Sequence, residues 1–134
     1  MNNNERITDY KNICYRFHRK FQILELLLRK ENISDSQQFI DTLNQLVEIA
    51  EYTQPSVIII EHFVADFNVS ENVVNFTRQN IIPILRKTGT EKLLVVTEEN
   101  TCADFFKPQN GDSLLIKIFK NKQEALDFVK CVLN

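Results

Sequence analysis

Residues 55–89 read PSVIIIEHFVADFNVSENVVNFTRQNIIPILRKTG and combine an apolar strand, a polar turn and an amphipathic helix. The four residues 57–60 are all β-branched and do not alternate with polar residues, which is typical of a strand covered on both faces. Ligands of open α/β sheets usually bind beyond the carboxyl ends of such strands. We therefore expect this strand at the centre of a sheet and a functional site in the turn that follows it.

Acidic, basic and amide side chains crowd into this turn. Together with Phe67 they define the predicted binding loop, which consists of Glu61, His62, Asp66, Phe67 and Asn68. Glu61 and His62 have the residue types of an acid–base pair, since histidine titrates near neutrality. The alternative is that Glu61 accepts local hydrogen bonds and His62 is an ordinary surface residue. No second ligand stands at metal spacing and no nucleophile is evident, so we predict no catalytic residue, no metal and no cofactor.

Composition indicates a soluble, single-domain protein. The chain has 134 residues, is 43% hydrophobic and carries a net charge of −2, with acids and bases interspersed. Without a basic stripe we expect no nucleic-acid binding, and without a long apolar run we expect no membrane span and no secretory leader. The three cysteines, an odd number spread far apart, suit reduced thiols in the cytoplasm: Cys14, Cys102 and Cys131. Only two glycines occur, so neither a phosphate-cradling loop nor a dinucleotide fingerprint can be built.

The order of elements predicts one α/β domain over residues 12–134, preceded by a flexible tail over 1–11. A hairpin is expected from residue 13 to 28 with His18, Arg19 and Lys20 in its turn. Helices are expected after capping boxes that begin at Ser34 and Asn121, and strands over 92–97 and 113–119. A short helix or ordered loop is expected between these strands. The result is β-β-α-β-α-β-(α)-β-α, a mixed sheet of about five strands with flanking helices.

The helix after the polar turn carries its own signals. Ser70 is a natural N-cap, and Gly89 stands where a left-handed residue ends a helix. Pro83 lies inside this helix, where it removes a hydrogen bond and costs about 3 kcal/mol. Either the helix kinks there, or a new helical turn begins with Pro83 in its first position.

Four stretches resemble the SpoIIAA-like families, which have the STAS-type fold of anti-sigma-factor antagonists and their uncharacterised bacterial relatives. They are VIIIE (57–61), VSENVVNFTRQNIIPILRKTG (69–89), KLLVVT (92–97) and IKIFKNKQEALDFVKCVL (116–133). The resemblance implies a cytoplasmic bacterial regulatory domain. In signalling members, the loop before the second helix carries a phosphorylatable serine or threonine and binds a protein partner. The matching position is close to Ser70, which is a candidate phosphosite or, alternatively, a helix cap alone.

The chain has ten phenylalanines, more than a domain of this size needs. Some of them are candidates for an apolar pocket, with core packing as the alternative: Phe63, Phe76, Phe105 and Phe106. Three functions stay open. We expect a non-enzymatic binding domain whose partner is another protein or a second copy of this chain. The alternatives are a binder of an apolar small molecule or lipid, and a small hydrolase or transferase that uses Glu61 and His62.

Overall fold

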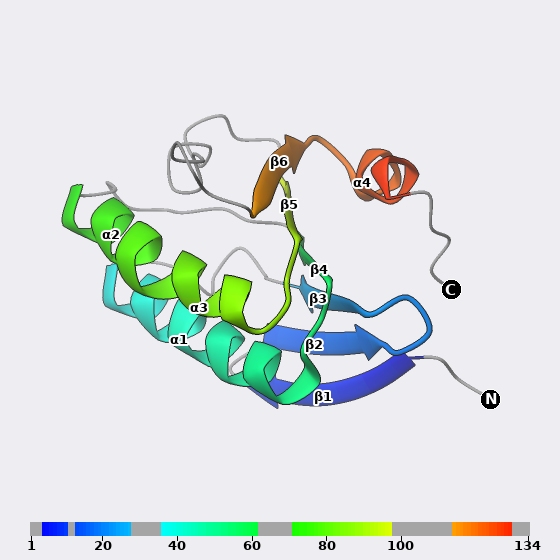
Figure 1. The fold of residues 1–134 in the computed structure, drawn as a ribbon, viewed down its shortest axis with the longest axis horizontal. Coiled ribbons are helices and arrows are strands. Elements are labelled where there is room, and N and C mark those ends of the chain that lie inside the picture. Colours follow the sequence, from blue (N-terminus) through cyan, green and yellow to red (C-terminus); the bar gives the residue numbers. More distant parts are fainter. Residues whose placement is uncertain (1–3, 11–12, 28–35, 62–70, 98–113, 130–134) are drawn as a thin grey trace.

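The computed structural model describes residues 4–10, 13–27, 36–61, 71–97 and 114–129, which form one mixed sheet and its helices (Figure 1). The strands are β1 (Asn4–Tyr10), β2 (Ile13–His18), β3 (Ile23–Leu27), β4 (Val57–Glu61), β5 (Lys92–Val96) and β6 (Leu115–Phe119). The helical segments are α1 (Ser36–Thr53), α2 (Glu71–Phe76), the π-helix η2 (Thr77–Ile81), α3 (Ile82–Lys87) and α4 (Lys122–Phe128). The predicted α/β class with a mixed sheet is confirmed.

The sheet has six strands in the order β1-β2-β3-β4-β5-β6. The pairs β1/β2 and β2/β3 are antiparallel, and the three following pairs are parallel. The prediction of about five strands is one too low, because Asn4–Tyr10 forms β1 and is not a flexible tail. Its sequence, NERITDY, has few apolar residues to signal a strand, but the open edge of β2 supplies backbone hydrogen bonds to any adjacent extended segment.

Strand β4 lies inside the sheet between β3 and β5, as its sequence predicts. All five of its residues are buried, including the terminal Glu61. Because successive side chains of a strand point to opposite faces, both faces of the sheet must be covered at β4.

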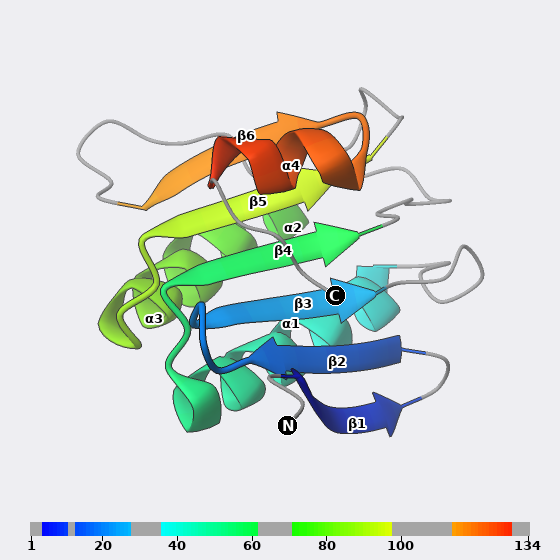
Figure 2. The same cartoon turned by 90° about the vertical axis from the view of Figure 1, so that its right-hand side faces the viewer.

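The helices cover the two faces unequally. Helices α1, α2 and α3 lie on one face and α4 lies on the other (Figure 2). Right-handed crossovers between strands that are neighbours in both sequence and space place their helices on the same side, which explains the grouping of α1 with α2 and α3. We call these sides the large-core face and the α4 face.

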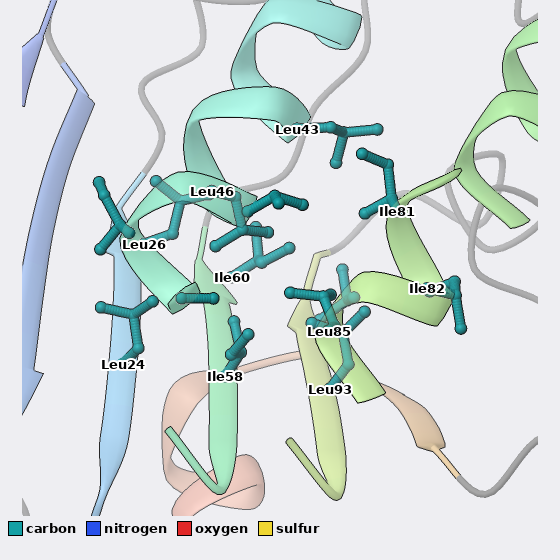
Figure 3. Close-up of a cluster of buried hydrophobic side chains, with 14 of the residues drawn as sticks. Leu24, Leu26, Leu43, Leu46, Ile58, Ile60, Ile81, Ile82, Leu85 and Leu93 are labelled. Atoms are coloured by element: carbon teal, nitrogen blue, oxygen red, sulfur yellow. The ribbon is translucent and has the colours of Figure 1, made fainter. Parts of the chain in front are cut away.

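The large-core face holds most of the buried apolar side chains. In Figure 3, side chains from α1 meet those from η2 and α3 above the sheet. The labelled members are Leu24, Leu26, Leu43, Leu46, Ile58, Ile60, Ile81, Ile82, Leu85 and Leu93. The α4 face has a smaller apolar cluster of Ile23, Val57, Ile59, Leu94, Val96, Ala125 and Leu126.

Pro83 is accommodated by a change of helix type. It is the second residue of α3, and the five residues before α3 form the π-helix η2. The Ile82 N–H, which follows η2, donates to the Thr77 carbonyl five residues back. The second of the two expected arrangements is therefore close to the structure, with Ile82 in the first position instead of Pro83. The π-helical turn lies directly before the proline, where the chain of helical hydrogen bonds lacks one donor because Pro83 has no N–H.

The expected helix signals act at two described ends. Gly89 has a φ of 95°, and its N–H donates to Arg86 while the Thr90 N–H donates to Leu85, which is a Schellman motif. At α4 the Asn121 side chain accepts from the Glu124 N–H at 2.9 Å, as predicted. The cap expected at Ser34 lies outside the described residues. Among the helices of the described ranges, none combines the length and the apolar character needed to cross a bilayer.

Candidate functional site

Two glutamates on neighbouring strands form the centre of a charged cluster on the α4 face. Glu25 lies in the middle of β3 and Glu61 ends β4. The parallel register pairs Glu25 with Ile59 and Leu27 with Glu61, so the two carboxyl groups point to the same face, two positions apart. Both side chains are buried, with 4% and 8% of their surface exposed.

His18 joins the cluster from β2. It is the last residue of that strand, and its register with Ile23 places it on the same face as Glu25. Its Nε2 atom hydrogen-bonds to Oε1 of Glu25, and the residue is 2% exposed. The prediction that His18 belongs to the hairpin turn is wrong, because strand β2 extends through it.

Lys122 closes the cluster from the other side. It is the first residue of α4, and its Nζ lies 2.7 Å from Oε2 of Glu25 and 3.5 Å from Oε1 of Glu61. The Lys122 side chain is 39% exposed, so the ammonium lies where the cluster meets solvent. Three strands and one helix therefore bring four ionisable side chains together.

The two carboxyl groups have opposite shifts in pKa. For Glu61, burial first and then the hydrogen bond and charge of Glu25 raise the pKa to about 8, against the opposing effect of Lys122. Burial alone would also raise the pKa of Glu25, but hydrogen bonds from Glu61, Lys122 and His18 and the Lys122 charge bring it down to about 2. The Lys122 pKa is raised: burial disfavours its charge, but both glutamates outweigh that effect. The opposite shifts favour one proton shared by the two carboxyl groups and held mainly by Glu61.

This arrangement holds one proton next to a carboxylate whose charge is balanced by the Lys122 ammonium. One carboxylate faces one ammonium, while the second carboxyl stays neutral. Within the described ranges, no group of three histidine, cysteine, aspartate or glutamate side chains is arranged to hold a metal ion. Instead, the Lys122 ammonium supplies the positive charge between the two carboxyl groups.

The described residues include only part of the predicted site. Glu61 belongs to the buried cluster, and Phe76 is half-buried and packs against the large core. Most of the predicted loop and pocket lies outside the described residues, namely His62, Phe63, Asp66, Phe67, Asn68, Ser70, Phe105 and Phe106. Cys14 is a free, partly buried thiol, as expected, while Cys102 and Cys131 lie outside the described residues. The pocket and the phosphosite at Ser70 stay predictions.

Three members of the cluster escaped the sequence reasoning: His18, Glu25 and Lys122. Glu25 had a detectable signal, because an acid inside the apolar strand ILELL needs a partner when it is buried. His18 and Lys122 stand in polar stretches and gave no such signal. Only the strand register and the position of α4 connect them with Glu25.

The helical run after β4 presents a second feature of interest. The exposed residues of α2 and η2 include four uncharged amides, Asn72, Asn75, Gln79 and Asn80. Within the π-helix the Nε of Arg78 is buried and has no hydrogen-bond partner among the described residues. π-Helical turns occur frequently at functional sites, where they redirect side chains.

A cavity of about 360 Å³ opens between the ends of α1 and α3. Its lining residues are Glu51, Gln54, Ile84, Lys87 and Thr88. None of the four phenylalanines predicted to form an apolar pocket lines this cavity, and three of them lie outside the described residues. The cavity therefore does not test the predicted pocket.

Comparison of the chain with protein-family models, with curated proteins and with solved structures finds no match.

Proposed function

We propose that this chain is a non-enzymatic, STAS-like regulatory or binding domain of the bacterial cytoplasm. It acts through protein–protein contacts at the segment 61–70 and along the helical run 71–87. The resemblance of the four sequence stretches supports this proposal. A sheet whose parallel strands carry helices on one face is compatible with it.

The observation that carries the proposal is the amide surface of α2 and η2. Asn75 and Gln79 stand four residues apart, so they are neighbours on the same side of the helical run, and both are exposed. A side-chain amide both donates and accepts hydrogen bonds, and it does so without the desolvation cost of a charge. Such a surface suits the polar backbone and side chains of a protein partner.

The position of Glu61 favours binding over catalysis. The alternative enzyme would use the Glu61 carboxyl on a substrate, but this group is hydrogen-bonded to Glu25 and lies 3.5 Å from the Lys122 ammonium. A general acid or base must come within hydrogen-bond reach of the proton that it transfers. With 8% of its side chain exposed, Glu61 is committed to contacts inside the domain.

The proposal is tested by site-specific crosslinking in bacterial cells. A photoreactive amino acid replaces Gln79 on η2 or, as the control, Asn44, which is exposed on α1. We expect a discrete protein adduct from position 79 and not from position 44, with the partner identified by mass spectrometry. The purified partner should then bind the wild type in calorimetry.

A matched pair of substitutions measures the contribution of the surface. Asn75→Lys should weaken binding of the purified partner at least about tenfold, since an added charge must be desolvated, whereas Asn44→Lys should leave it unchanged. Equal binding by the two variants, or identical adducts from positions 79 and 44, would contradict the proposal.

A further inference from the structure

Helix α4 is fastened to the sheet at its two ends by different kinds of contact. At its start, Lys122 contacts Glu25 and Glu61. At its end, the Phe128 ring lies 5.5 Å from that of Phe119, and Lys117 lies 4.8 Å from its centroid. Lys92 also approaches the Phe128 ring, at 5.8 Å. The end at Lys122 depends on carboxyl groups, and the end at Phe128 on aromatic and cation–π contacts.

The hold at Lys122 depends on the contacts of a single side chain. The positive end of a helix dipole disfavours a cation in the first turn, so Lys122 gains nothing from its own helix. Its favourable contacts are the two glutamates of the sheet. In addition, the fully buried residues of α4 are Ala125 and Leu126, with Phe128 partly buried against the same cluster. The strands are tied together by backbone hydrogen bonds, so the helix is the element that yields when the cluster changes.

We propose that Glu25, Glu61 and Lys122 form a proton-operated latch, in which loss of the proton held between the two carboxyl groups releases the start of α4 from the sheet.

Charge balance gives the physical reason. With the proton present, one carboxylate and one ammonium neutralise each other in the enclosed site. Its loss leaves two carboxylates facing the single ammonium of Lys122. Release of α4 returns water to the second carboxylate, which removes the penalty of a buried charge.

The surrounding charged groups determine the direction of the effect. Facing Glu61 are Glu25 of β3 and Lys122 of α4, with His18 of β2 on the far side of Glu25. Arg16 is the register partner of Glu25 on β2 and is exposed. The β5 partner of Glu61 is the apolar Val96, and Lys92 and Lys117 lie over Phe128.

Release of α4 has two opposing effects on Glu61. It removes the Lys122 ammonium, which by itself raises the pKa, and it restores hydration, which lowers it. The Glu61 side chain is 8% exposed, whereas that of Lys122 is 39% exposed and its charge is screened by solvent, so hydration prevails and the released state has the lower pKa. Alkaline conditions therefore favour release.

The test follows amide hydrogen exchange of residues 122–128 from pH 6 to pH 9 in the full chain, corrected for the intrinsic pH dependence of exchange. In the wild type, the opening equilibrium of these amides should rise with pH, at most about tenfold per unit, and level off above the Glu61 pKa of about 8. Amides of β4 and β5 report global unfolding and should open less. Glu61→Gln, which mimics the protonated carboxyl, should abolish the rise, whereas Glu91→Gln, an exposed control, should retain it.

An opening equilibrium of the wild type that stays constant or falls with pH would overturn the latch, as would an unchanged rise in Glu61→Gln. If the amides of β4 and β5 are unprotected from exchange in Glu61→Gln, the variant has not folded and the wild type alone tests the latch. The ¹³C resonance of the Glu61 carboxyl must then titrate with the same midpoint as α4 opening, and a different midpoint would overturn the proposal.

Discussion

The two faces of the sheet solve the problem of burial in different ways. On the large-core face, twenty buried residues of the described ranges, nearly all from the sheet and from α1, α2, η2 and α3, form one cluster that is apolar apart from the Tyr15 hydroxyl. On the α4 face, seven apolar residues lie beside a cluster of four ionisable side chains. The first face gains stability from apolar area, which is insensitive to pH. The second depends on the position of one proton.

The largest expected effect tests the apolar half of this comparison. Leu46→Ala removes a fully buried side chain of α1 and should lower the free energy of unfolding by about 2–5 kcal/mol. Leu126→Ala on α4 is the matched change on the other face. It should cost less, because a short helix over a small cluster can settle into the cavity. Urea denaturation of both variants checks the order, and a larger loss in Leu126→Ala would reverse our ranking of the faces.

The pH dependence of stability tests the charged half. A group whose pKa is raised by folding stabilises the folded protein at pH values below its unfolded-state pKa. The contribution of Glu61 is therefore complete below pH 4.5, its usual pKa, and is lost as the pH rises through about 8. Glu25 has a lowered pKa, so its contribution is present above 4.5 and is lost as pH falls toward 2. Stability should therefore be highest near pH 5 and decline toward pH 8, by at most about 1.4 kcal/mol per pH unit.

Denaturation of the wild type and of Glu61→Gln at several pH values measures this decline. The variant should lose the alkaline decline and keep the acidic one. A wild type that is as stable at pH 8 as at pH 5 would show that Glu61 does not hold the proton.

The smallest effect concerns an imperfection of the large-core face. The Tyr15 hydroxyl is buried and has no hydrogen-bond partner in the part of the chain that the structure describes, and burial raises its pKa so that it stays protonated. Tyr15→Phe should therefore leave the protein equally stable or stabilise it by about 1 kcal/mol, since a buried polar group without a partner is removed. Thermal unfolding checks this, with Tyr52→Phe, on an exposed α1 residue, as the control. A clear loss of stability in Tyr15→Phe alone would indicate a partner for the hydroxyl.

Local signals predicted much of the fold. The buried strand 57–60, the end of a helix at Gly89 and the cap at Asn121 were all readable because each depends on residues close in sequence. Strand β1 was missed, since an edge strand held by backbone pairing needs no apolar pattern. The amide surface of α2 and η2 was not predicted, because which of these side chains are exposed depends on how the helices pack on the sheet.

The sequence by itself determined that β4 is an interior strand ending in an acid, and that the chain is an α/β domain. It also placed one helix end at Gly89 and one helix start at Asn121, because turns and caps are short-range interactions. Only the tertiary structure decided what Glu61 does. Strand register brought Glu25 and His18 to its face, and α4 delivered Lys122 from sixty-one residues further along the chain. A partner at that distance leaves no local pattern, since it is selected by the packing of whole elements.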